Sequence, residues 1–435
     1  MVLLKKTSFI FFPLFLSCHW AAFAQEPLTL KAAYELSLKV SEDIASKAEL
    51  IREAQGHFTQ ALSGILPKAE YVITRQEQDA DGSAADSGSN SNLLRKTTPQ
   101  QKFVLSQPLF SGFKEFAAMQ GAGLEKSQRM HEKKRAEELL FIDVMEAYYG
   151  LLQAREDLGL LDRIQTVLHD RIGQLDERVR LGRSRESEIK TALVDLKLAE
   201  VDKEDLRQAE IVWRRLLEFY IGRPLTGALR DDDIPAVQDP AALDSPLQTK
   251  ERPDVLAAKE AYRVSDKKVG IATGGLLPSA KLDGNYYTQR VGTQSGIDWD
   301  VLLTVNVPIF EGTSVIGDIQ SAAANRGVAK LAWSKAERLA AVEAADAYDA
   351  FQASLRQEKA LWEAKQAAEE NAAIQSEEYQ NQLVNNLDVL QALHFQEDTS
   401  RRWNQAHYQT KKNYWRYKIA VGMGIEPPVV SKVEP

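Results

Sequence analysis

The sequence predicts an internally duplicated α+β membrane protein, made of long coiled-coil-like helices and four β-strands per chain. Two motifs recur in the second half: Ser106–Gly112 (SQPLFSG) returns as Asn306–Gly312 (NVPIFEG), and Gly64–Ala69 (GILPKA) returns as Gly275–Ala280 (GLLPSA). After the second motif of each pair comes a stretch without proline, over residues 109–223 and 309–426. A repeat at this spacing indicates one structural unit used twice, and the absence of proline permits very long helices.

Residues 1–24 have the pattern of a secretory signal peptide. Lys5 and Lys6 precede an apolar run over residues 9–16, and Ala22-Phe23-Ala24 fits the small-x-small rule for cleavage. Cys18, the only cysteine, lies inside this segment, where it is either discarded with the peptide or a site of lipidation. In both cases the mature chain can form no intramolecular disulfide, so its stability must come from packing or assembly.

The chain is acidic, with a net charge of −8 that becomes −10 once the signal segment, with its two lysines and no acid, is removed. An exported acidic protein is not expected to bind nucleic acid. The sequence beyond the signal segment contains no run of about 18 apolar residues, so it predicts no transmembrane helix.

The first structural repeat is expected to span residues 25–223. Thr29 is a candidate cap for a first helix, and a second helix over residues 43–66 should end where Pro67 follows. A β-hairpin over residues 68–107 is predicted from two segments that alternate with period two, Lys68–Gln78 and Gln100–Gln107. Pro108 is expected to close the second strand, and the small polar residues 79–98 predict an exposed loop.

The second repeat, residues 254–426, follows the same order. A helix is expected to end at Pro278, and a hairpin over residues 279–307 contains the clearest alternation of the chain, from Trp299 to Val307. The prolines of residues 224–253 indicate a linker between the repeats, and a tail over residues 427–435 ends the chain.

Long helical hairpins are predicted over residues 109–223 and 309–426. One apolar stripe has spacings of three and four residues: Leu158, Leu161, Ile164, Leu168, Ile172, Leu175 and Val179. A helix from Phe110 to Leu181 would be about 105 Å long, which requires a coiled-coil-like partner. Breaks at residues 181–184 (LGRS) and 383–386 (LVNN) should turn each chain segment back on itself.

Four strands cannot close a barrel, because barrels with filled interiors need about eight. Both predicted hairpins have one apolar face with aromatic residues, and such a face must be buried or placed in lipid. Three copies of the chain would supply a 12-stranded barrel, an even number typical of outer-membrane barrels. The alternative is a soluble α+β protein whose helices cover the sheet, which helices of this length cannot do compactly. Tyr286, Tyr287 and Trp299 are candidates for an interfacial aromatic belt, with core packing as the competing interpretation.

At the corners between its predicted helices and strands, the chain resembles the TolC family of outer-membrane efflux and secretion channel-tunnels. The resemblance covers most of the mature sequence, from Leu28 to Gly422. It rests on the following residues: the helix-to-strand corner Leu66-Pro67, the strand-to-helix corner at 107–112, their second-half copies, the turn at 387–390 (LDVL), and the helix-final pairs Ile221-Gly222 and Val421-Gly422.

The resemblance implies a homotrimeric passive duct in the outer membrane of a Gram-negative bacterium, a β-barrel in outer-membrane lipid continuous with a helical barrel across the periplasm. It implies efflux or type I secretion, with a periplasmic adaptor protein docked at the hairpin tips and an inner-membrane RND or ABC transporter as pump. In the family, paired aspartates near the tip form a gate. Asp388 matches the first, Gln391 replaces the second, and Val384 stands where the family usually has glycine before this turn.

Three Asp388 side chains around a three-fold axis would form an acidic ring that favours cations. The alternative is that Asp388 caps or solvates the helix after the turn. The tip residues that we expect beside Asp388 and Gln391 are Leu181, Gly182, Arg183, Val384 and Asn385.

No pattern of catalytic, cofactor-binding or metal-binding residues is found in the sequence. Five histidines lie scattered without ligand spacing and are interpreted as solvated: His57, His131, His169, His394 and His407. The run Asp231–Asp233 is interpreted as solvated linker in preference to a cation site. The sequence therefore predicts a protein that is not an enzyme. A periplasmic coiled-coil scaffold or adaptor without a pore is the alternative to the duct.

Overall fold

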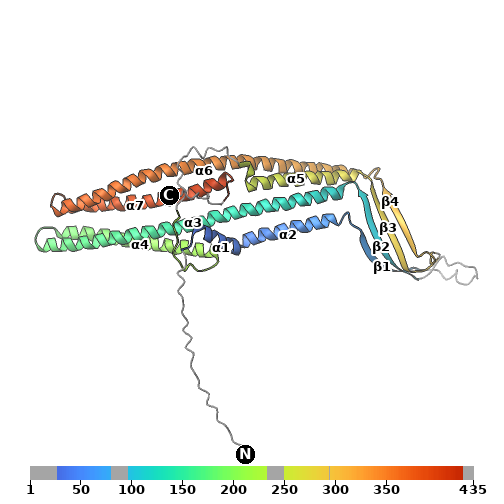
Figure 1. Cartoon of the computed structure of the whole chain (residues 1–435), viewed down its shortest axis with the longest axis horizontal. Coiled ribbons are helices and arrows are strands. Elements are labelled where there is room, and N and C mark those ends of the chain that lie inside the picture. The colour runs from blue at the N-terminus through green and yellow to red at the C-terminus, as the bar shows by residue number, and fades with distance from the viewer. Residues whose placement is uncertain (1–26, 80–96, 233–248, 293, 425–435) are drawn as a thin grey trace, which may run out of the picture.

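The computed structural model describes residues 27–79, 97–232, 249–292 and 294–424. The molecule is elongated, with two helical hairpins ending at one extremity and a β-sheet at the other (Figure 1). The predicted signal segment, most of the loop at 79–98, the centre of the linker and the tail at 427–435 lie outside the described residues.

The helices repeat with the offsets of the sequence motifs. The longest, α3 (Lys114–Arg180) and α6 (Ser314–Gln380), have 67 residues each. The shorter helices form equivalent pairs: α2 (Glu42–Leu62) with α5 (Pro253–Thr273), and α4 (Glu186–Ile221) with α7 (Asn386–Ala420). A short α1 (Leu30–Val40), capped by the Thr29 side chain as predicted, precedes them.

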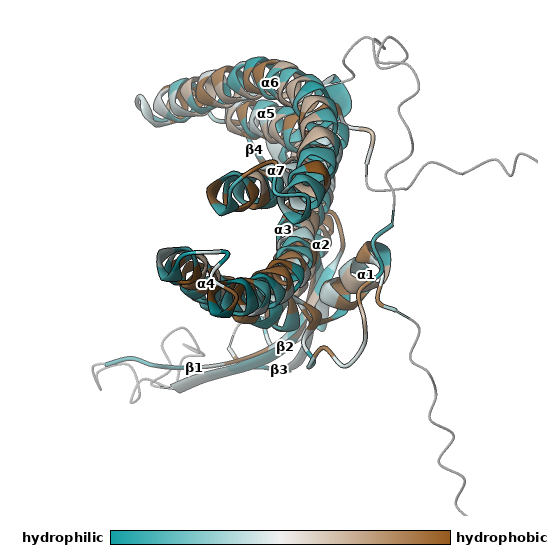
Figure 2. Cartoon of the chain, turned by 90° about the vertical axis from the view of Figure 1, so that its left-hand side faces the viewer, coloured by the Kyte–Doolittle hydropathy of each residue, from teal (hydrophilic) through white to brown (hydrophobic). Residues whose placement is uncertain are grey.

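Each long helix is accompanied by two shorter ones placed end to end. Helices α4 and α7 return along α3 and α6 from the tips, which confirms the two predicted hairpins. Helices α2 and α5 continue toward the sheet (Figure 1). Seen from the tips, the helices form a curved wall with α6 at one end and α4 at the other (Figure 2).

The sheet is antiparallel in the order β1-β2-β3-β4. Its strands are β1 (Lys68–Glu77), β2 (Thr97–Ser111), β3 (Ser279–Arg290) and β4 (Trp299–Asn306). The prediction that Pro108 closes the second strand is wrong, because β2 continues to Ser111 with a shift of pairing between Pro108 and Phe110. A local irregularity can accommodate a residue that has no N–H to donate.

The expected start of the first long helix at Phe110 is also wrong. Phe110 and Ser111 still pair with β3, and the turn into α3 occurs at Gly112 and Phe113, which both have positive φ (68° and 61°). Two predicted helices end earlier than expected: α2 stops at Leu62, and α5 stops at Thr273, followed by a 3₁₀ turn at Gly274–Leu276.

Two hydrophobic clusters hold the helices together. The first lies at mid-length and joins α1, α3, α4, α6 and α7 around Phe141, Phe351 and Tyr417. The second joins the hairpins near the tips around Leu168, Leu175 and Leu393. Neither cluster includes residues of the sheet.

Candidate functional site

The sheet carries a row of four aromatic side chains across all its strands. Tyr71 pairs with Phe103, Phe103 with Tyr286, and Tyr286 with Trp299. All four are exposed, from 46% for Tyr71 to 67% for Trp299. Exposed aliphatic residues follow toward the helices on the same face: Leu105, Val301, Leu303 and Val305. No described helix covers this face, which agrees with the expectation that the helices do not fold over the sheet (Figure 1).

The opposite face of the sheet is polar and internally hydrogen-bonded. The Asn285 amide accepts from Lys102 (2.9 Å) and donates to Asp300 (2.7 Å). The Tyr287 hydroxyl also donates to Asp300, at 2.8 Å. Tyr287 therefore lies away from Tyr286 and Trp299, because neighbouring residues of a strand point to opposite faces. The three predicted belt residues do not share one face.

The sheet is open within the described part of the chain. Strand β1 pairs only with β2, and β4 pairs only with β3. Each outer strand therefore presents a row of unpaired backbone groups. Such edges are templates for pairing with another chain unless they are covered.

At the far end, both hairpins turn through the same backbone geometry. Arg183 N donates to Arg178 O in the first turn, and Leu383 N donates to Glu378 O in the second. The left-handed residue is Gly182 (φ 71°) in the first turn and Gln382 (φ 62°) in the second.

The predicted breaks at residues 181–184 and 383–386 would set Gly182 opposite Val384, and this correspondence is wrong. The offset of the helices is 200 residues, which makes Gln382 the counterpart of Gly182. Gln382, not Val384, occupies the conformation that favours glycine.

Asp388 lies in the first turn of α7 and takes part in a capping box. Its carboxylate accepts from Asn385 N at 3.1 Å, and the Asn385 side chain accepts from Asp388 N at 3.2 Å. This is the capping role considered as the alternative to an acidic ring. Asp388 is half-buried and Gln391 is exposed; Leu181, Gly182 and Arg183 are exposed at the other tip.

A cation–π arrangement joins the two tips and was not anticipated from the sequence. The Tyr379 ring of α6 lies against two guanidinium groups of α3, Arg171 at 3.5 Å and Arg178 at 4.2 Å. Arg171 Nε also donates to the buried Asn386 side chain at 2.9 Å. Burial lowers the pKa of Arg171, and the neighbouring charge of Arg178 acts in the same direction.

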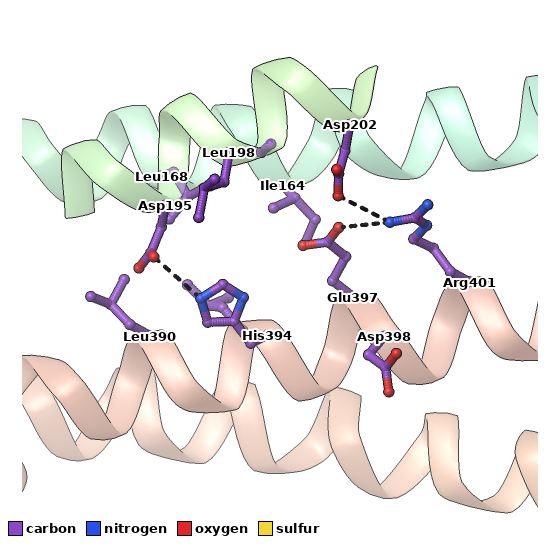
Figure 3. Close-up of a pocket in the computed structure, with 12 residues that line it drawn as sticks. Ile164, Leu168, Asp195, Leu198, Asp202, Leu390, His394, Glu397, Asp398 and Arg401 are labelled. Atoms are coloured by element: carbon purple, nitrogen blue, oxygen red, sulfur yellow. Dashed lines mark hydrogen bonds and ion pairs between the residues drawn. The ribbon is translucent and has the colours of Figure 1, made fainter. Parts of the chain in front are cut away.

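Farther from the tip, a cleft of about 380 Å³ separates α4 from α7 (Figure 3). Leu168 and Leu390 line its apolar part. Ion pairs cross it from His394 to Asp195 (3.3 Å) and from Arg401 to Asp202 (3.2 Å). The two hairpins are therefore held together here by partly exposed polar contacts, which are weaker than buried apolar packing.

His407 and Asp231 form ion pairs, contrary to the expectation that both are only solvated. His407 Nδ1 lies 2.7 Å from the Glu358 carboxylate, and Lys411 Nζ donates to Asp231 at 2.6 Å. The His407 side chain is only 23% exposed and stacks on Trp403. Asp231 thereby fixes the described end of the linker to α7.

Among the described helices, none is both long enough and apolar enough to cross a membrane. The same residues hold no cluster of three or more histidine, cysteine or acidic side chains arranged for a metal ion. The features that remain are an open amphipathic sheet and a pair of joined hairpin tips.

Residues 247–418 match the family model described as outer membrane efflux protein. The chain is 25% identical to outer membrane protein OprJ of Pseudomonas aeruginosa, over 86% of this chain and 79% of OprJ. The second half of the chain is therefore similar to outer membrane efflux proteins, and most of the chain is similar to OprJ. The chain also has the fold of solved structures that are less similar in sequence. A membrane protein from Pseudomonas aeruginosa matches with a TM-score of 0.78 and 20% identity, covering 92% of both chains.

A second solved structure, outer membrane protein VceC of Vibrio cholerae, matches with a TM-score of 0.77 and 18% identity. The match covers 91% of this chain and 97% of VceC. The agreement extends over the helices and the sheet together, which confirms the fold. Taken with the matches to the family model and to OprJ, it bears out the resemblance inferred from the sequence.

Proposed function

We propose that three copies of this chain form a channel-tunnel in the outer membrane that serves as the passive exit duct of an efflux pump or a type I secretion system. The observation that carries the proposal is the open sheet, with one exposed apolar face, one polar face and two unpaired edges. Joining the edges of three sheets would give 12 strands, and closure would remove every edge. The exposed aromatic row would then lie on the lipid side, where such residues anchor a barrel at the interface.

The helical wall supports the same assembly. Residues along α4 and α6 expose apolar side chains that no described helix covers: Val194, Leu198, Val201 and Phe219 on α4, and Val328, Leu331 and Val342 on α6. Because α4 and α6 lie at opposite ends of the wall (Figure 2), a ring of copies would bring them together and bury both stripes.

The tips are the proposed periplasmic end. There the duct would meet a periplasmic adaptor and, through it, an inner-membrane RND or ABC transporter. The proposed gate comprises Asp388 with its capping partner Asn385, the neighbouring Gln391, Leu181, Gly182, Arg183 and Val384, and the contact of Tyr379 with Arg171 and Arg178. Opening would require the tips to separate, which means breaking the cation–π contacts first.

A bilayer experiment tests the duct and its gate. The purified chain in planar lipid bilayers should form cation-selective channels, and Asp388→Asn should lower the preference for cations. Because asparagine also caps helices, this variant should keep its fold. Glu188→Gln, at the equivalent position of the first tip, is the matched control.

Unchanged selectivity in Asp388→Asn would leave Asp388 as a helix cap only. A chain that stays in the soluble periplasmic fraction and forms no channel would instead favour the scaffold or adaptor without a pore.

A further inference from the structure

The internal repeat indicates how the two ends of the helical wall meet. In the second repeat, α5 lies between α3 and α6 and packs on both. Its equivalent in the first repeat, α2, packs on α3, the counterpart of α6. Among the described residues, α2 and α6 form no contact of comparable extent that would correspond to α5 on α3. In a ring of copies, the symmetry of the repeat would place α6 of a neighbouring copy there.

Within the chain, the contact of α5 with α3 lies beside the junction where the start of α5 meets the end of α7. Arg252, with a side chain only 1% exposed, donates to both Asp254 and Glu343 at 2.7 Å. Its guanidinium also donates to Ala340 O (3.5 Å) and to Ala420 O (3.4 Å), near the end of α7. One buried cation therefore joins three helices.

Helix α3 adds a second pair of charges at this junction. Arg135 lies 4.0 Å from Asp254 and forms an ion pair with Glu138, one turn along α3, at 3.0 Å. Glu138 is buried, and burial raises its pKa. The junction thus contains two cations and three carboxylates.

The junction of α2 with α4 keeps the acids and lacks the buried cation. Three positions correspond: Ser41 to Arg252, Asp43 to Asp254, and Asp143 to Glu343. A cleft of about 720 Å³ opens here, lined by both aspartates and by the exposed Phe219. Within the described residues neither aspartate forms an ion pair. Two further charged residues, Glu42 and Lys47, line the cleft. Burial raises the pKa of Asp143, and the nearby Glu146 carboxylate adds to this effect.

The outer face of α6 carries the missing charge. Lys335 corresponds to Arg135, and Arg338 corresponds to Glu138. The acid of the first repeat is therefore replaced by a cation in the second repeat. Both side chains are exposed and have no ion pair among the residues that the structure describes. They lie on the exposed stripe of α6 between Leu331 and Val342.

We propose that Arg338 of each copy enters the cleft between α2 and α4 of the next copy and occupies the place that Arg252 fills within the chain. Lys335 of the same copy then faces Asp43, as Arg135 faces Asp254. The number of cations at the two junctions would then be matched. The first repeat has Ser41 where the second has Arg252, and the second repeat has Arg338 where the first has Glu138. This contact rests on the proposed ring and specifies which side chains close it.

A second pair of corresponding positions supports the same alignment. Within the chain, Trp415 of α7 donates to the Tyr149 hydroxyl of α3 at 3.4 Å. The corresponding residues are Arg215 of α4 and Asp349 of α6, both exposed and without an ion pair in the described part of the chain. Asp349 continues the stripe of Arg338, three turns farther on. An aromatic contact inside the chain is thus replaced by opposite charges that face the neighbouring copy.

Cross-linking in the full-length chain tests the contact directly. Asp43→Cys with Lys335→Cys introduces the only cysteines after Cys18, and a short bis-maleimide should join copies into covalent dimers and trimers in outer-membrane vesicles. The matched control pairs Asp43→Cys with Lys330→Cys, which is exposed on α6 but rotated about 140° from Lys335. The control should stay uncross-linked.

Charge reversal tests the energetics. Arg338→Glu should reduce the fraction of assembled protein in detergent about tenfold or more, because it leaves three carboxylates together. Adding Asp143→Lys should restore assembly, and Lys330→Glu should have no effect.

Two results would overturn this contact and leave the duct intact, provided that the wild-type chain assembles. One is the absence of a cross-link in the Asp43→Cys, Lys335→Cys variant. The other is that Arg338→Glu assembles as well as Lys330→Glu. A wild-type chain that does not assemble would overturn the duct itself.

Discussion

The α5–α7 junction is closed by a buried guanidinium, whereas the equivalent α2–α4 junction is an open cleft lined by carboxylates. The backbones correspond residue by residue, since the long helices are offset by 200 residues and the shorter pair by 211. The difference lies in the surroundings: the closed junction has a helix on either side, and the open one has α3 alone. Duplication followed by divergence has given one copy an interior and the other a surface.

The same contrast recurs along the wall. Gly150 lies against the Trp213 ring, whereas its counterpart Ala350 accepts through its carbonyl from Asn413 at 3.3 Å. At the tips, Gly182 has a counterpart in Gln382. The same fold is therefore stabilised by different side chains in its two halves. Substitutions at matched positions test whether the side chains of one half can replace those of the other.

The largest effect is expected at Arg252. Arg252→Met removes the cation and leaves Asp254, Glu343 and the carbonyl of Ala420, at the end of α7, without this donor, which should cost about 3 kcal/mol or more. Ser41→Met at the open junction removes only a helix cap, which costs about 1 kcal/mol. Thermal unfolding in detergent compares the two. Equal losses would show that the Arg252 network adds nothing beyond a cap.

Gly150 should be next. A Cβ at this position would lie 2.6 Å from the Trp213 ring, so Gly150→Ala forces the two helices apart. Overpacking of this kind costs about 1–3 kcal/mol. Combining Gly150→Ala with Trp213→Asn recreates the pair found in the second half and should recover part of the loss. If the double variant is less stable than the sum of the single changes, the two halves cannot exchange this contact.

The tips give a smaller and opposite pair of effects. Gln382→Gly should stabilise the chain by about 1 kcal/mol, because it removes a side chain from a left-handed conformation. Gly182→Gln should destabilise the chain by a similar amount. Denaturant midpoints for both variants provide the measurement, with Gln380→Gly inside the last turn of α6 as a control that should destabilise. A loss of stability in Gln382→Gly would mean that the Gln382 side chain makes up for its strained backbone.

Much of the fold follows from local patterns. The strands follow from period-two alternation, and the hairpins follow from breaks in long proline-free helices, because both signals lie within short windows of sequence. The exact ends of β2 and α3 did not follow, since the sheet pairing of Phe110 and Ser111 is a tertiary effect that outweighs the helical pattern beside it.

The candidate site was harder to predict. Asp388 was selected through the resemblance to the TolC family, whereas Tyr379 meets Arg171 and Arg178 only when the hairpins lie side by side. The 200-residue offset between the repeated motifs predicts that Gly182 corresponds to Gln382. The predicted breaks at residues 181–184 and 383–386 did not follow this offset. In the sheet, period-two alternation puts the neighbours Tyr286 and Tyr287 on opposite faces, which the grouping of Tyr286, Tyr287 and Trp299 in one belt did not take into account.

The smallest effect, a dependence on pH, is expected at His407. Burial alone would lower the pKa of His407, but contacts with the Asp231 and Glu358 carboxylates outweigh it and raise the pKa above the usual 6.5. Protonated His407 is therefore stabilised in the folded chain. Its contribution is fully present below pH 6.5 and is lost as the pH rises through the higher folded pKa.

The unfolding temperature should accordingly fall as the pH rises above 6.5, and His407→Gln should flatten this slope. Arg207, the counterpart in the first half, is half exposed and pairs with Glu204 on its own helix. Arg207→Gln should leave the slope unchanged, because arginine keeps its charge throughout this range. A slope that survives in His407→Gln would assign the pH dependence to another group, and the anchoring of the linker through Asp231 would then rest on Lys411 and Tyr408.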